Sequence, residues 1–227
     1  MNDPYIDPSS GVLKNKLGIN NTHDLSQAIG DFATSAQVSL TLDPPDVTCD
    51  ATMLQQIHKR LFGKIFDWAG SFRTVQIFKG TDPNDLDDYF FDARFFDYAF
   101  ANLYSELDSV NFFNGLSFNQ LVLALSQNYA ELNYIHPFRE GNGRSQRVFW
   151  SFALYKAGWN IDWYQISKEE NDRASFSSRI TGDSSELVKM FTKHIEPLNE
   201  HALNLYTGHL LSENQLSRKE RKHGISR

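Results

Sequence analysis

The residues with the clearest capacity for chemistry lie together in one short segment, HPFREGNGRSQR, at positions 136–147. His136 precedes Pro137, and proline pushes the residue before it out of the helical region, so the imidazole is expected to project from a fixed backbone where a helix stops. Near neutral pH an unperturbed imidazole is mostly unprotonated and can accept a proton from a nearby hydroxyl. The end of the preceding helix would instead favour the imidazolium, and the sequence leaves that balance open.

The residues that follow favour the binding of an anion. Gly141, Asn142 and Gly143 stand at the expected start of a helix, where unhindered backbone N–H groups and the positive end of the helix dipole can hold a phosphate. Arg144 and Arg147 are three positions apart, so both guanidinium groups can lie on one helical face and reach the outer oxygens of a polyphosphate. The segment therefore predicts a phosphate site.

Glu140 directly precedes this site and would repel a phosphate unless a divalent cation lay between them. One carboxylate, together with phosphate oxygens and waters, is a common way of holding Mg²⁺, so Glu140 predicts a magnesium ion. Each feature has a plainer interpretation, because a histidine often caps a helix, Gly-Asn-Gly often forms a turn, and such arginines often cover a solvated face. Together they supply the base, the cation site and the phosphate site that attack on a nucleotide phosphate requires.

Helices are expected on both sides of this segment. One is predicted from Ser117 to about Tyr134 and another over residues 142–156. Two more are predicted after Ser167 and Asp183, each of which has Glu three residues later, as in a capping box. Pro197 is expected to split or kink the last helix. The inward positions of the first two are Leu121, Ala124, Leu125 and Leu132, then Val148, Phe149, Phe152 and Leu154.

The first half of the chain contains helical patterns and one extended pattern. Apolar residues at steps of three and four predict a helix over residues 24–42, and Asp50 is a candidate N-cap for a short helix that stops near Gly63. Strand-favouring residues within 68–80 predict one extended or hairpin segment. Residues 85–109 are rich in aromatics and are expected to form a wide, heavily buried helix.

Composition narrows the classes of function. The 227 residues carry 22 Lys and Arg against 28 Asp and Glu, a net charge of −6, which argues against a surface built to grip nucleic acid or anionic lipid. A single cysteine, Cys49, excludes an internal disulfide framework. We find no apolar stretch long enough to span a membrane and no signal-peptide pattern, so a cytoplasmic protein is expected. We divide the chain into an N-terminal arm (1–20), one main domain (21–200) and a basic, helical or solvated tail (201–227).

The segment at 136–147 resembles the HxFx(D/E)GNGRxxR signature of the Fic family. Similarity to the family extends over roughly residues 15–195 and includes NKLGI from Asn15, LFGKIFDWAG from Leu61, RTV from Arg73, and Trp163. The resemblance implies an all-α fold, a helical bundle with a small β-hairpin flap. That fold agrees with the helices and the single extended segment expected above.

The resemblance also implies an activity, the transfer of AMP from ATP to a hydroxyl side chain (Ser, Thr or Tyr) of a target protein with release of pyrophosphate. In that reaction His136 would be the general base, and Glu140 would hold Mg²⁺. The residues implied at the nucleotide are Arg139, Gly141, Asn142, Gly143, Arg144 and Arg147, with Lys79 and Gly80 of the flap nearby. The flap, residues 72–80, would clamp the target chain by strand addition.

Two features of the sequence refine this expected activity. Doc-type relatives have Lys in place of the second glycine of the signature and transfer the γ-phosphate, whereas Gly143 is retained here, which favours nucleotidyl transfer. Many Fic proteins carry an inhibitory (S/T)xxxE(G/N) motif, but Glu170 and Glu213 lack the required Ser or Thr four residues earlier. We therefore expect a stand-alone form, the toxin of a toxin–antitoxin pair, inhibited by a small antitoxin-like protein whose Glu would pair with Arg147.

Two alternative functions stay open from the sequence. One is a nucleotide-binding regulatory module with little transferase activity, and the other is a deadenylylase that removes AMP from a modified protein. A bacterial cytoplasmic location is expected, with export into a host cell as the alternative.

Overall fold

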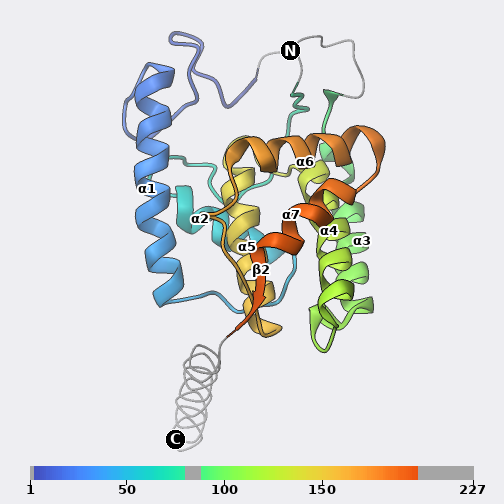
Figure 1. Ribbon diagram of the computed structural model, residues 1–227. Coiled ribbons are helices and arrows are strands. Elements are labelled where there is room, and N and C mark those ends of the chain that lie inside the picture. The colour runs from blue at the N-terminus through green and yellow to red at the C-terminus, as the bar shows by residue number, and fades with distance from the viewer. Residues whose placement is uncertain (1–2, 80–87, 199–227) are drawn as a thin grey trace, which may run out of the picture.

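The computed structural model describes residues 3–79 and 88–198, and this part of the chain is built mainly from α-helices, as expected. Figure 1 shows α5 in the middle of the bundle, between α2 on one side and α4 on the other, with α1 and α3 outside them and α6 crossing one end. The helices are α1 (Thr22–Leu42), α2 (Ala51–Phe62), α3 (Phe96–Ser109), α4 (Phe118–Ile135), α5 (Asn142–Lys156), α6 (Lys168–Thr181) and α7 (Ser185–His194).

The central helix α5 has the bounds predicted for it, Asn142–Lys156. Because α2 and α4 pack on different sides of it, its buried residues do not form one narrow stripe. Trp150 is completely buried, whereas Phe152, which we expected in the core, is only partly buried. The predicted inward residues of α4 are all buried. These two helices flank the signature segment, so a rigid core holds it on both sides.

The predicted helix starts follow from side-chain caps. The Asp50 carboxylate accepts a hydrogen bond from the N–H of Met53 at 2.8 Å, and the Ser167 hydroxyl accepts one from the N–H of Glu170 at 3.0 Å. Helix α1 begins two residues before the predicted Asp24, because Asn21 caps it by accepting from the Asp24 N–H at 2.9 Å. Capping thus set the starts of α2 and α6 where the sequence predicted them.

The single helix predicted over residues 85–109 is wrong in its first part. Residues 89–92 are not helical, a short 3₁₀ turn η2 (Ala93–Phe95) follows, and α3 begins only at Phe96. The predicted heavy burial of this helix is also an overestimate, since the side chain of Tyr98 is 74% exposed. Aromatic residues favour strands as readily as buried helices, so composition alone could not separate the two. Residues 85–87 lie outside the described part.

Pro197 neither splits nor kinks a helix. Helix α7 ends at His194, and Ile195–Pro197 form strand β2, which pairs antiparallel with β1 (Trp159–Ile161). A further 3₁₀ turn, η3 (Asn111–Phe113), joins α3 to α4. The small sheet was not predicted, because strands of three residues are too short to show a period of two. Pro197 is tolerated at the end of an edge strand, where its missing N–H is not needed.

The N-terminal arm is ordered by its contacts. Ile6 and Leu13 form an antiparallel bridge, and the N–H of Lys14 donates to the carbonyl of Tyr5 at 2.8 Å. Tyr5 and Val12 are buried against the main body. The expected tail, residues 201–227, lies outside the described part. Among the described helices, none is both long and apolar enough to cross a bilayer.

Candidate active site

His136 is the C-cap of α4, and it adopts a left-handed backbone conformation with φ of 46°. This conformation ends the helix at the residue before Pro137, as the sequence predicted. The ring stacks on Phe90 with 3.8 Å between the ring centres. Its Nδ1 lies 3.1 Å from the carbonyl oxygen of Asn133, which can only accept, so Nδ1 carries the proton. The other nitrogen, Nε2, is left with a lone pair and can act as a base.

Burial is the main cause that lowers the pKa of His136, to about 3. The positive charges of Arg73, Lys79 and Arg179 act in the same direction, while the hydrogen bond to Asn133 opposes them. The sequence left open whether His136 is protonated, and its surroundings in the folded chain disfavour the imidazolium. His136 is neutral at pH 7, as a proton acceptor must be.

Arg73 was not singled out by its chemistry in the sequence, yet it ties His136 to the flap. The side chain is buried, and its Nε donates to the carbonyl of His136 at 2.9 Å. Its two terminal nitrogens donate to the carbonyls of Val75 at 2.7 Å and of Phe91 at 2.5 Å. The Arg73 N–H also donates to the carbonyl of Pro137 at 2.8 Å. One guanidinium thus fixes the end of α4 relative to both sides of the flap.

The flap is an antiparallel pairing of two extended segments. Phe78 and Tyr89 form a bridge, the N–H of Lys79 donates to the carbonyl of Asp88 at 2.9 Å, and the N–H of Phe90 donates to the carbonyl of Ile77 at 3.2 Å. The extended segment expected within residues 68–80 is therefore present, but it pairs with residues 88–90, in the stretch where a helix was predicted. Gly80, which was expected near the nucleotide, lies outside them.

The start of α5 has the geometry expected of an anion site. Gly141 is the N-cap with φ of 84°, and a Cβ atom there would lie 2.4 Å from the Phe62 ring, so only glycine fits. The Asn142 side chain accepts from the N–H of Phe138 at 2.8 Å and donates to its carbonyl at 2.7 Å. That amide therefore closes the loop. The backbone N–H groups of the first turn have no partner within the helix and are available to a ligand.

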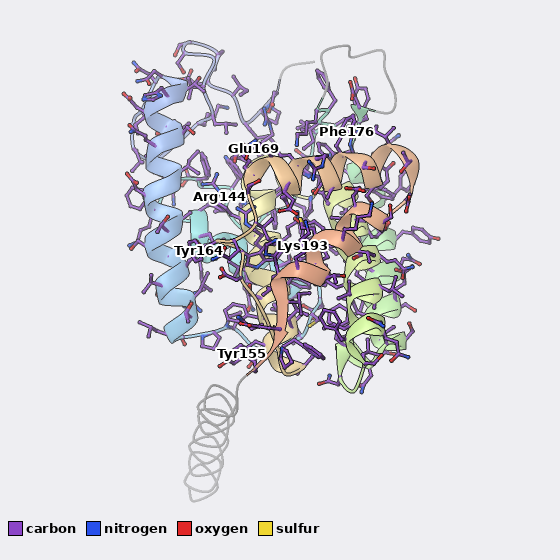
Figure 2. The ribbon with its side chains drawn as sticks, viewed as in Figure 1. Arg144, Tyr155, Tyr164, Glu169, Phe176 and Lys193 are labelled. Carbon is purple, nitrogen blue, oxygen red and sulfur yellow. The ribbon has the colours of Figure 1, made fainter. Side chains whose placement is uncertain are left out.

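Cationic side chains surround this helix start. Figure 2 shows Arg144 toward the end of α5 that lies nearer to α6, and its guanidinium pairs with Glu140 at 3.2 Å and lies over the Phe62 ring. A terminal nitrogen of Arg147 is 3.6 Å from where a Cβ on Gly143 would be. Within the described ranges no carboxylate pairs with Arg147. The helix start therefore carries positive charge that an anion can neutralise.

Two expected ligand residues have partners in the protein. Arg139 donates to the Asp3 carboxylate at 2.8 Å, so the N-terminal arm holds it. Glu140 keeps a partly exposed carboxylate beside Arg144. Residues 3–79 and 88–198 contain no group of three or more His, Cys, Asp or Glu side chains that could cage a metal. A lone carboxylate fits a Mg²⁺ ion whose other ligands are phosphate oxygens and waters.

His58 was also missed by the sequence reasoning. It is completely buried on α2 and lies 2.9 Å from the carbonyl oxygen of Glu140 through Nε2. A histidine at a regular position of an apolar helix gives no signal in one sequence, because most such residues are ordinary core residues. Only the folded chain shows that it contacts the signature loop.

A separate cavity of about 640 Å³ lies between α3, α4 and α6 and adjoins the flap at Tyr89. Its lining includes Tyr134, Glu131 and Arg179 but no residue of 136–147. The cavity is thus a second recess beside the flap and is distinct from the start of α5.

Known proteins share both the sequence and this architecture. The Fic/DOC family model matches residues 48–154. A probable protein adenylyltransferase Fic from Salmonella typhimurium is 32% identical over 203 residues, which cover 87% of this chain and 94% of the relative. The chain belongs to the Fic/DOC family.

Two further Fic proteins extend the comparison. The protein adenylyltransferase VbhT of Bartonella schoenbuchensis is 36% identical over 178 residues, 78% of this chain but only 36% of VbhT. The crystal structure of the VirB-translocated effector BepC from Bartonella tribocorum, with bound AMPPNP, superposes with a TM-score of 0.78 at 26% identity. That match covers 86% of this chain and 97% of the BepC chain in that structure. The whole described bundle, and not only the signature loop, is therefore of the Fic type.

Proposed function

We propose that this Fic protein is a protein adenylyltransferase, which transfers AMP from ATP to a hydroxyl side chain of a target protein. The observation that carries the proposal is the position of His136, a neutral imidazole whose Nε2 carries a lone pair, at the end of α4, one short loop before the cationic start of α5. Relatives named as protein adenylyltransferases and a nucleotide-bound Fic structure support it.

In the proposed reaction Nε2 of His136 accepts the proton of a Ser, Thr or Tyr hydroxyl. The hydroxyl oxygen forms a bond to the α-phosphorus of ATP, and the bond from that phosphorus to the oxygen bridging the β-phosphate breaks. Pyrophosphate leaves with the negative charge. The backbone N–H groups of residues 141–143 and the guanidinium of Arg144 stabilise the phosphate oxygens, while Arg147 contacts the γ end.

Glu140 is the residue proposed to hold Mg²⁺ together with phosphate oxygens. The ion would neutralise charge on the phosphates and on the departing pyrophosphate. The pairing of Glu140 with Arg144 keeps the carboxylate beside the helix start. A bound ion would therefore lie next to the residues proposed to hold the phosphates.

The flap is proposed to align the target. Its residues 72–79 would pair with an extended target segment through main-chain hydrogen bonds, and Lys79 and Gly80 would lie near the nucleotide. Such pairing brings the acceptor hydroxyl close to His136, because Arg73 holds the flap and His136 together. Retention of Gly143 supports nucleotidyl transfer over transfer of the γ-phosphate.

Regulation and location are also part of the proposal. An antitoxin-like partner would place a Glu against Arg147, which has no acidic partner within the described residues, and would thereby block the γ-phosphate. We propose the domain division 1–20, 21–200 and 201–227. The bacterial cytoplasm is the proposed place of action, and the VirB-translocated effector BepC makes a host cell the alternative.

Labelled ATP tests the central proposal. Incubation of the protein with α-labelled ATP, Mg²⁺ and a bacterial lysate should label a protein band, and His136→Ala should lower the labelling by at least about a hundredfold. Undiminished labelling by this variant would remove His136 as the base. Tight ATP binding without label in any lysate would favour the regulatory module, and release of AMP from a prelabelled target would favour the deadenylylase.

A further inference from the structure

His58 has both ring nitrogens engaged with backbone atoms that the sequence separates widely. The N–H of Gly70 donates to Nδ1 at 2.8 Å, so Nδ1 carries no proton. The proton is therefore on Nε2, which donates to the carbonyl of Glu140 at 2.9 Å. The neutral imidazole links α2, the chain before the flap, and the signature loop in one defined tautomer.

The ring is also fixed by packing against the loop that it bonds. His58 stacks on Phe138 with 3.7 Å between ring centres, and Phe62 lies 4.8 Å away on the next turn of α2. Phe62 is the residue that leaves no room for a side chain on Gly141. His58 and Phe62 together thus contact the loop on both sides of Glu140.

The bond to the Glu140 carbonyl determines where the next N–H points. In a planar trans peptide the C=O and the following N–H point in opposite directions, and the described chain contains no cis peptide. Since the Glu140 carbonyl is directed at the buried His58, the N–H of Gly141 is directed the opposite way. A rotation of this peptide would replace an N–H with a carbonyl oxygen at the start of α5 and would repel phosphate.

We propose that His58 is a positioning residue that holds the Glu140–Gly141 peptide in the orientation that presents the Gly141 N–H to a phosphate. This inference deepens the proposed function and rests on its phosphate site. The hydrogen bonds at Nδ1 and Nε2 define the single neutral tautomer that this role requires. His58 does not touch the reacting atoms and acts only through the loop.

Nucleotide affinity separates positioning from general stability. His58→Phe keeps the aromatic packing but removes both hydrogen bonds, and we expect the Kd for MgATP, measured by calorimetry, to rise by about tenfold to a hundredfold. His58→Gln offers an acceptor and a donor in one side chain, and we expect it to recover most of the affinity. Leu107→Ala, in the core of α3, is the control that lowers the unfolding temperature without changing the Kd.

Hydrogen exchange shows whether the effect is local. In His58→Phe the amides of residues 139–143 should exchange faster while those of α4 and α7 keep their protection. An unchanged Kd in His58→Phe, or faster exchange throughout the molecule as in Leu107→Ala, would show that His58 serves stability alone and would overturn the proposal.

The wild-type protein provides a test that does not depend on a folded variant. In amide NMR spectra the Gly141 N–H should shift when MgATP is added, and the His58 ring should carry its proton on Nε2. ATP binding without a response of the Gly141 amide would overturn the inference. Binding and exchange need no target protein, so a wild-type protein that passes these tests but labels no protein would contradict only the proposed transferase.

Discussion

At the scale of single residues, two buried polar side chains, His58 and Arg73, and the partly buried His136 prepare the site, and among the described residues none of the three forms an ion pair. His136 is neutral because burial lowers its pKa, His58 is neutral for the same reason, and Arg73 remains cationic although burial lowers its pKa to about 10. All three bond to backbone carbonyls around residues 133–140. Hydrogen bonds from side chains to backbone carbonyls are therefore the main interactions that position this site.

Replacement of Arg73 by lysine tests this view. Lysine has one donor group in place of the guanidinium fork, so several buried carbonyls of α4 and the flap would lose their partner. We expect Arg73→Lys to lower the free energy of unfolding by roughly 2 to 4 kcal/mol and kcat by about tenfold. Denaturant unfolding and the labelling rate are the measurements. The matched control is Arg94→Lys at an exposed ion pair, and equal effects of the two variants would contradict a special role for Arg73.

At the scale of elements, the decisive feature is the junction of α4, the loop and α5. One helix ends in a left-handed residue and the next begins at a glycine with positive φ, so the chain turns sharply between them. The Asn142 side chain spans this turn by two hydrogen bonds to Phe138. The end of α4 thereby places the imidazole of His136, and the start of α5 places backbone N–H donors, a few residues apart.

The two signature glycines should respond differently to alanine. At Gly141 a Cβ would lie 2.4 Å from the Phe62 ring, and the positive φ adds strain, so Gly141→Ala should cost roughly 1 to 3 kcal/mol of stability and abolish ATP binding. At Gly143 a Cβ would make only an ordinary contact, 3.6 Å from Arg147. We expect Gly143→Ala to keep its stability and to weaken ATP binding alone. Calorimetry with thermal unfolding checks both, and equal stability of the two variants would refute the steric argument.

At the scale of the whole molecule, the arm, the flap and the bundle converge on the signature loop. Asp3 of the arm pairs with Arg139, and the Tyr5 hydroxyl accepts from the N–H of Thr74 at 3.1 Å. Helix α2 contributes His58, which donates to the Glu140 carbonyl. Parts of the chain far apart in sequence therefore stabilise one loop, and the stability of the site should follow that of the fold.

The buried histidines make stability depend on pH. The unfolded chain binds a proton at His58 below about pH 6.5, whereas the folded chain does so only near pH 4. The contribution of His58 to the free energy of unfolding should therefore be at its maximum above pH 6.5. It should fall as the pH decreases to about 4, with a slope of up to about 1.4 kcal/mol per pH unit. His136 acts in the same direction. Denaturant titrations across this range measure the slope, and an unchanged slope in His58→Gln would contradict the assignment.

The sequence by itself determined the features that depend on neighbouring residues. It located α5 with its bounds, the caps at Asp50 and Ser167, and the loop whose Pro137 and Gly141 force a turn. These follow from local sterics and capping, which act within a few residues. The extended segment at residues 88–90 was missed because aromatic residues favour strands as readily as buried helices, and the sheet of β1 and β2 was missed because strands of three residues show no period of two.

Only the tertiary structure decided the protonation of His136 and the roles of Arg73 and His58. The pKa of an imidazole depends on how much water and which charges surround it, and these are set by Phe90, Arg179 and other residues far along the chain. In the same way, the Glu140 carbonyl finds its donor 82 positions away, on α2. A sequence states which groups are available, but the packing of distant elements determines which of them meet.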